Sequence, residues 1–86
     1  MHTVELMEQG IAALETLGYG VREEYLGGAG GGGCEIAGRK WVFVDIALSK
    51  SDQLDQILEA LRIDPAVHSI SLSSGLSEVL GIRRAA

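Results

Sequence analysis

Apolar residues recur at helical spacing in three parts of the chain, which predicts three helices. The first helix is expected over residues 4–17, with a stripe of Val4, Met7, Ile11 and Leu14. Gly10 lies inside this helix and costs about 1 kcal/mol relative to alanine. The second helix carries Leu54, Ile57, Leu58 and Leu61. A short third helix is expected before Gly81, with Leu76, Val79 and Leu80 on its apolar side.

Residues at the ends of these stripes predict where the helices begin and end. Thr3 is expected to cap the first helix, and Gly18 to follow its last turn in the left-handed conformation. Ser49 or Ser51 is expected to cap the second helix. Asp64 precedes a proline, which ends that helix because a residue before proline avoids helical geometry. The third helix has two candidate caps, Ser73 and Ser74.

Between the first two helices, the pattern changes to one that is typical of strands. All four aromatic residues lie there, and aromatic and β-branched residues favour strands; they are Tyr19, Tyr25, Trp41 and Phe43. We expect strands at Gly20–Leu26, Cys34–Ala37 and Trp41–Ile46. A type II′ turn at Gly38-Arg39 is expected to join the second strand to the third.

The third of these strands has apolar residues on both faces, because Val42, Val44 and Ile46 alternate with Trp41 and Phe43. This pattern is typical of a central strand that is covered twice. Residues Val67–Leu72 predict a fourth strand at an edge of the sheet.

The resulting order, α-β-β-β-α-β-α, predicts a small two-layer α+β domain in which a mainly antiparallel sheet packs on helices. The first three strands are expected to form a meander. The 86 residues allow a single domain that spans residues 1–86.

Composition and charge exclude several classes of function. The net charge of −5 and the pI near 4.8 argue against nucleic-acid binding. No apolar run approaches the length of a membrane span, and the first residues do not resemble a signal peptide. A single cysteine favours a cytoplasmic protein. We expect no metal and no cofactor, because the sequence has no motif that holds either.

The chain resembles short bacterial proteins of unknown function that share an L-G-x-x-V-R…G-G-x-G-G-G-x-C…V-F-V-D layout. The resemblance covers most of the chain and implies no activity.

A narrower resemblance, over residues 17–63, is to the start of ImmA/IrrE-type zinc peptidase domains. It is carried by Leu17–Arg22, the glycine-rich loop, Val42–Asp45 and the Leu48-Ser49 pair. That family places an H-E-x-x-H motif on the following helix. Here Glu59–Ile63 occupies the corresponding position, and both histidines and the glutamate base are missing. No zinc site can therefore be carried over.

The glycine-rich loop, residues 27–33, contains six glycines and one alanine. One interpretation is a nest of backbone N–H groups that holds an anion such as a phosphate. Its candidate ligand-binding residues are Gly30, Gly31, Gly32, Gly33 and Arg22. We favour the alternative, a flexible connection or a loop that another backbone approaches closely.

Cys34 and His68 are the candidate catalytic residues. A catalytic thiol must be exposed and must have a partnered base, and His68 reaches Cys34 only if the fourth strand lies near the second. We favour a small buried core residue for Cys34, since free cysteine is most often buried.

Two groups of charged residues have weaker functional interpretations. Three carboxylates on successive strands can bind a hard cation if they share a face; they are Glu23, Glu35 and Asp45. Asp45 can instead cap the loop that leads into the second helix. A small basic spot, formed by Arg22, Arg39 and Lys40, is interpreted as part of a mixed-charge surface.

These observations favour a non-catalytic interaction module over an enzyme. An edge strand is available to a protein partner or to a second copy, and Trp41 and Phe43 form a hot spot if no helix covers them. The alternatives are a thiol-dependent enzyme or redox protein that uses Cys34, and a domain that binds a phosphorylated ligand through the glycine-rich loop.

Overall fold

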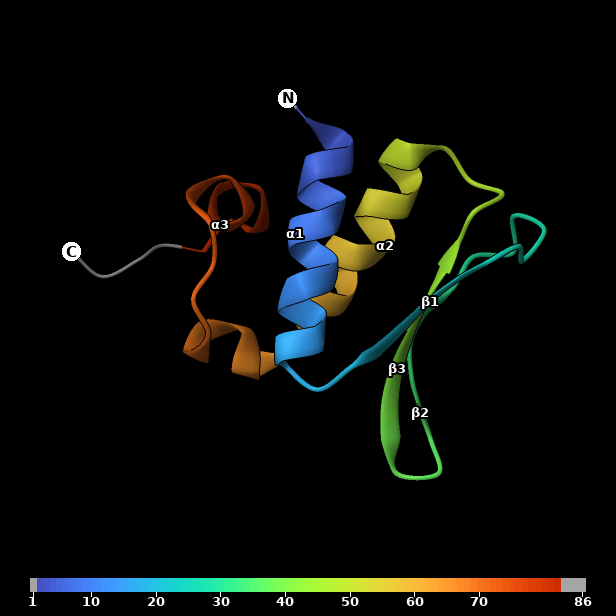
Figure 1. Ribbon diagram of the computed structural model, residues 1–86, viewed down its shortest axis with the longest axis horizontal. Helices are drawn as coiled ribbons and strands as arrows, with labels where there is room; N and C mark the ends of the chain where they lie inside the picture. Colours follow the sequence, from blue (N-terminus) through green and yellow to red (C-terminus); the bar gives the residue numbers. More distant parts are fainter. Residues whose placement is uncertain (1, 83–86) are drawn as a thin grey trace.

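The computed structural model describes residues 2–82, which form three α-helices, three strands and one 3₁₀ helix (Figure 1). Along the chain these elements are α1 (Thr3–Thr16), β1 (Gly20–Glu24), β2 (Gly32–Ile36), β3 (Arg39–Asp45), α2 (Lys50–Ile63), η1 (Pro65–Ser69) and α3 (Ser74–Leu80). The fold is a small α+β domain, as the pattern of the sequence predicts. No helix among the described residues has the length and apolar character needed to cross a membrane.

The sheet has the order β1-β3-β2, with β3 parallel to β1 and antiparallel to β2. The expected meander of three antiparallel strands is therefore wrong. The glycine-rich loop is too long to form a tight hairpin, so β1 and β2 need not be neighbours. β3 is the most apolar strand and lies between them, where it is central as expected.

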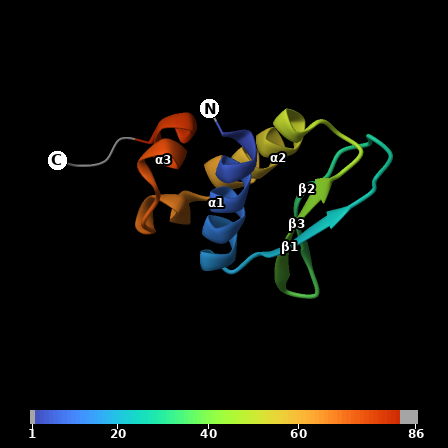
Figure 2. The same ribbon diagram turned by 45° about the horizontal axis from the view of Figure 1, so that its top comes forward.

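The helices lie on one side of the sheet, and its other face is uncovered (Figures 1 and 2). Val42 and Val44 of β3 point toward the helices and are fully buried. The core lies between these layers, and its other most deeply buried apolar residues are Leu14, Ile57, Leu61, Leu76 and Val67. The expectation that β3 is covered on both faces is thus correct for one face only.

The helix caps confirm most of the predicted helix ends. Ser49 accepts a hydrogen bond from the N–H of Asp52 at 3.1 Å, and Ser73 caps α3 in the same way. Gly18 follows α1 with a φ of 97°, as expected. Thr3, however, does not cap α1. It is the first residue of the helix, and the cap position belongs to His2, which makes no capping bond through its side chain.

The hairpin between β2 and β3 turns at Ala37-Gly38, and Ile36 pairs with Arg39. Both turn residues have positive φ, 52° for Ala37 and 80° for Gly38. This is the type I′ geometry, which matches the twist of the strands. The type II′ turn expected at Gly38-Arg39 is wrong by one residue.

The fourth strand expected at Val67–Leu72 does not form. Pro65 begins the 3₁₀ helix η1 instead, and the Asp64 carboxylate accepts a hydrogen bond from the N–H of Ala66 at 2.9 Å. This local cap fixes a tight turn that buries Val67. The order along the chain is accordingly α-β-β-β-α-η-α.

Candidate functional site: a groove beside the edge strand β2

The carboxylate of Asp45, at the end of β3, organises the glycine-rich loop. Its Oδ2 accepts hydrogen bonds from the N–H groups of Gly28 and Gly30, at 2.9 and 3.1 Å. Its Oδ1 accepts from the N–H groups of Leu26 and Ala47, at 3.0 and 2.9 Å. The loop is therefore a nest of N–H donors, and the anion that it holds is a side chain of the same protein.

Asp45 is fully buried, and its environment favours the ionised carboxylate. Burial raises the pKa of Asp45, but the hydrogen bonds from the four backbone N–H groups outweigh burial. The pKa therefore lies below its ordinary value. An external phosphate that used Gly28 and Gly30 would have to displace this carboxylate.

The loop leads into β2 through a close approach between two backbones. A Cβ atom at Gly31 would overlap the carbonyl oxygen of Phe43 in β3. A Cβ at Gly33, by contrast, would have only the carbonyl oxygen of Trp41 nearby, at 3.9 Å. The backbone is thus tightly held at Gly31, whereas Gly33 has open space above it.

That open space is part of a groove of about 350 Å³ between β2 and α2. Its floor is the backbone of Gly31, Gly32 and Gly33, and its wall is one flank of α2, formed by Asp55, Gln56, Glu59, Ala60 and Ile63. We call this the β2–α2 groove. Because its floor has no side chains, a ligand in the groove can approach the backbone of β2 directly.

The outer edge of β2 borders the groove and pairs with no other strand of the described chain. In a two-residue hairpin, the pair next to the turn is hydrogen-bonded, and such pairs alternate along the strands. Ile36 and Cys34 therefore bond to β3. The N–H and C=O groups of Gly33 and Glu35 consequently point to the free edge.

The wall of the groove carries two free carboxylates. Asp55 and Glu59 are both exposed, and neither makes an ion pair with a described residue. They stand one helical turn apart, where like charges repel each other. Ile63, one turn further along α2, is 65% exposed although it is a large apolar residue. The wall is therefore acidic along most of its length and apolar at one end.

The uncovered face of the sheet carries Trp41 and Phe43, which stack with their ring centroids 6.3 Å apart. Figure 2 shows no helix on this face of the sheet, so the condition stated for a hot spot is met among the described residues. The arginines on this face, however, already interact with other residues of the chain. Arg39 lies over the Trp41 ring at 4.7 Å, and Arg22 is paired with Glu24 at 2.6 Å. Free charge that can select a partner is found at the groove instead.

Cys34 lies on β2 and is exposed, so the expectation of a buried core residue is wrong. The reason is that β2 is an edge strand and that Cys34 lies beside Trp41, on the uncovered side of the sheet. His68 is also exposed and belongs to η1. The ribbon places η1 and β2 on opposite sides of the helices (Figures 1 and 2). The two candidate catalytic residues are thus not brought together.

The residues predicted to bind a ligand through the glycine-rich loop do not all lie at one site. Gly31, Gly32 and Gly33 line the groove, whereas Gly30 donates its N–H to Asp45. Arg22 is on the uncovered face and does not join them.

The three strand carboxylates do not converge either. Asp45 is buried under the loop, while Glu23 and Glu35 are exposed on opposite edge strands. Among residues 2–82, no cluster of His, Cys, Asp and Glu side chains is arranged to hold a metal ion.

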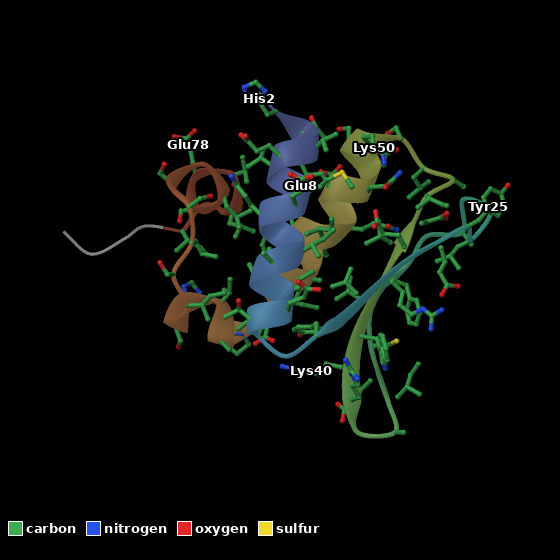
Figure 3. The ribbon with its side chains drawn as sticks, in the orientation of Figure 1. His2, Glu8, Tyr25, Lys40, Lys50 and Glu78 are labelled. Carbon is green, nitrogen blue, oxygen red and sulfur yellow. The ribbon has the colours of Figure 1, made fainter. Side chains whose placement is uncertain are left out.

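Lys40 extends from β3 toward the helices rather than toward the loop (Figure 3). Its Nζ lies 3.7 Å from Oδ2 of Asp64 and 4.5 Å from the Tyr19 ring centroid, and the Tyr19 hydroxyl donates to Asp64 at 2.8 Å. The pKa of Asp64 is lowered, first by the N–H of Ala66 and then by the Tyr19 hydroxyl, with Lys40 adding less. Burial and Asp64 raise the pKa of Tyr19. This cluster ties the start of the sheet to the end of α2.

The residues of the groove wall were missed by the sequence analysis. Asp55, Gln56 and Glu59 form a polar stripe on α2, and such stripes usually face solvent. The signal that distinguishes them is a pair of like charges one helical turn apart, Asp55 and Glu59. The position of this pair of carboxylates beside a free strand edge depends on tertiary structure and cannot be read from the sequence.

Comparisons of the chain with protein-family models, curated proteins and solved structures each returned no match.

Proposed function

We propose that the protein is a non-catalytic interaction module that binds an extended segment of a partner protein by strand addition at the free edge of β2. In this mode a peptide pairs with an exposed strand through main-chain hydrogen bonds, and its alternate side chains enter adjacent pockets. The observation that carries the proposal is the β2–α2 groove, which lies beside the unpaired N–H and C=O groups of Gly33 and Glu35.

The character of β2 also supports this proposal. Proteins protect exposed strand edges with charged residues, and the other edge strand, β1, carries three of them, Arg22, Glu23 and Glu24. β2 carries one, Glu35, and two of its five residues are glycine. It is therefore the less protected edge and the more open to a partner.

Binding of short synthetic peptides tests the proposal. The probe is a fluorescent heptapeptide of alternating valine and lysine. The comparison peptide has the same sequence, with alternate backbone nitrogens methylated. Fluorescence anisotropy should show saturable binding of the first peptide. It should show binding of the methylated peptide weakened by about tenfold or more, because N-methyl groups block ladder hydrogen bonds.

The variant Gly33→Leu tests whether the groove is the site. Its side chain projects into open space, so the fold tolerates it, but it fills part of the groove. We expect peptide affinity to fall about tenfold. The matched control is Gly75→Leu on α3, where a Cβ makes an ordinary 3.8 Å contact with Leu6 and lies far from the groove. Equal affinity of both variants and the natural protein would contradict the proposal.

A further inference from the structure

The chemistry of the groove specifies its occupant more narrowly. We propose that the occupant is a strand of alternating character, with basic side chains on the face toward α2 and apolar side chains on the other face. This inference rests on the proposed function, because it assigns the partner's side chains at the same strand edge.

The spacing of residues along α2 is close to the spacing of alternate residues along a strand. Residues four apart on an α-helix are separated by about 6 Å along its axis. Alternate residues of a strand are separated by about 6.6–6.8 Å. Asp55, Glu59 and Ile63 form such a series along the wall of the groove. Successive side chains on one face of an added strand that runs along α2 would therefore meet them one after another.

Charge favours basic side chains at this wall. The carboxylates of Asp55 and Glu59 are exposed, repel each other and make no ion pair with a described residue. Glu35, on the floor strand, adds a third exposed carboxylate at the same edge. A lysine or arginine on the partner strand would relieve this repulsion, whereas an acidic side chain would increase it. The wall therefore selects basic residues at alternate positions.

The other face of the added strand would lie beside apolar residues of β2. Side chains of adjacent strands lie side by side on each face of a sheet. On the uncovered face, β2 presents Cys34 and Ile36, and Ile36 is 53% exposed. Trp41 is the cross-strand partner of Cys34 in β3. Apolar side chains at the positions of the partner strand that point away from α2 would extend this surface and cover it.

The experiment compares three fluorescent heptapeptides in which valine alternates with lysine, glutamate or glutamine. At low ionic strength, the natural protein should bind the lysine peptide about tenfold more tightly than the glutamine peptide, and the glutamate peptide most weakly. Added salt should reduce these differences. The double variant Asp55→Lys/Glu59→Lys should reverse the order, and Asp55→Asn/Glu59→Gln should remove the preference.

The matched control is Glu8→Lys/Glu15→Lys, which changes the net charge by the same amount at two exposed positions of α1. It should keep the preference for lysine. An equal loss of preference in the control would show an effect of net charge alone and overturn the inference. If all three peptides bind equally and N-methylation blocks them, the inference is wrong and the proposed function stands. If none binds, both are wrong.

Discussion

Asp45 gives the glycine-rich loop its shape, although a loop with six glycines has a high entropic cost of ordering. Four backbone N–H groups converge on one buried carboxylate, which satisfies the donors and fixes the path of the chain from β1 to β2. The N–H of Asp45 in turn donates to Oε1 of Gln56 on α2, at 3.0 Å. A single residue therefore links the loop, the central strand and the helix that walls the groove.

The substitution Asp45→Asn tests this role. An asparagine has one acceptor oxygen, so an amide group would face two of the N–H donors and leave them unsatisfied in a buried site. We expect the melting temperature at pH 7 to fall by about 10 °C or more. The control Asp55→Asn, on the exposed face of α2, should change it by only a few degrees. Similar melting temperatures for the two variants would contradict the assigned role.

The same substitution should change the response to acid. The pKa of Asp45 is lower in the folded protein than in the unfolded chain, because the N–H donors favour the charged form. Its contribution to stability is fully present above pH of about 4 and is lost as the pH falls through the folded pKa. Asp64 contributes in the same direction. Urea unfolding between pH 2 and 6 should show a shallower dependence in Asp45→Asn than in the natural protein.

At the scale of elements, α1 and α2 pack closely because Gly10 has no side chain. A Cβ at Gly10 would lie 2.6 Å from Cγ2 of Ile57, a fully buried β-branched residue of the core. From the sequence, Gly10 is expected only as a cost to helix formation. The structure gives it a packing role that no helix propensity reveals.

We therefore expect Gly10→Ala to destabilise the protein by about 1–2 kcal/mol, even though alanine is the better helix former. The matched control is Gly75→Ala in α3, where the added methyl group makes an ordinary contact and the change should stabilise slightly. Both are measured by urea unfolding. A stabilising effect of Gly10→Ala would show that the helices do not approach as closely as described.

The predicted elements succeed where local patterns decide the structure and fail where tertiary contacts decide it. The stripes of α1 and α2 and the caps at Ser49 and Ser73 follow from spacing and hydrogen-bonding chemistry. The segment 67–72 has an alternating pattern that suits a strand. The cap at Asp64 and the burial of Val67 impose a 3₁₀ turn there instead.

At the scale of the whole molecule, the helices cover one face of a three-stranded sheet and leave β2 at an open edge (Figure 1). This arrangement follows from the position of β3, whose apolar residues require the centre of the sheet. A meander with a fourth strand beside β3 would also place β3 inside the sheet, so the sequence pattern alone does not decide between the two orders.

The candidate site, too, depends partly on tertiary packing, so only part of it can be predicted from the sequence. The unusual glycine run makes Gly31, Gly32 and Gly33 candidates, and these residues do line the groove. Closeness in sequence associates them with Arg22 rather than with Asp55 and Glu59. Only the packing of α2 beside β2 brings the acidic wall to the glycines.

Amide hydrogen exchange, followed by NMR with and without the valine–lysine peptide, tests the central claim most directly. In the free protein, the amides of Gly33 and Glu35 should exchange fast, because they point to the free edge of β2, whereas those of Cys34 and Ile36 should be protected by β3. Saturating peptide should slow the exchange of Gly33 and Glu35 at least tenfold. Exchange at these two amides that is already slow in the free protein, or that does not respond to the peptide, would contradict strand addition at β2.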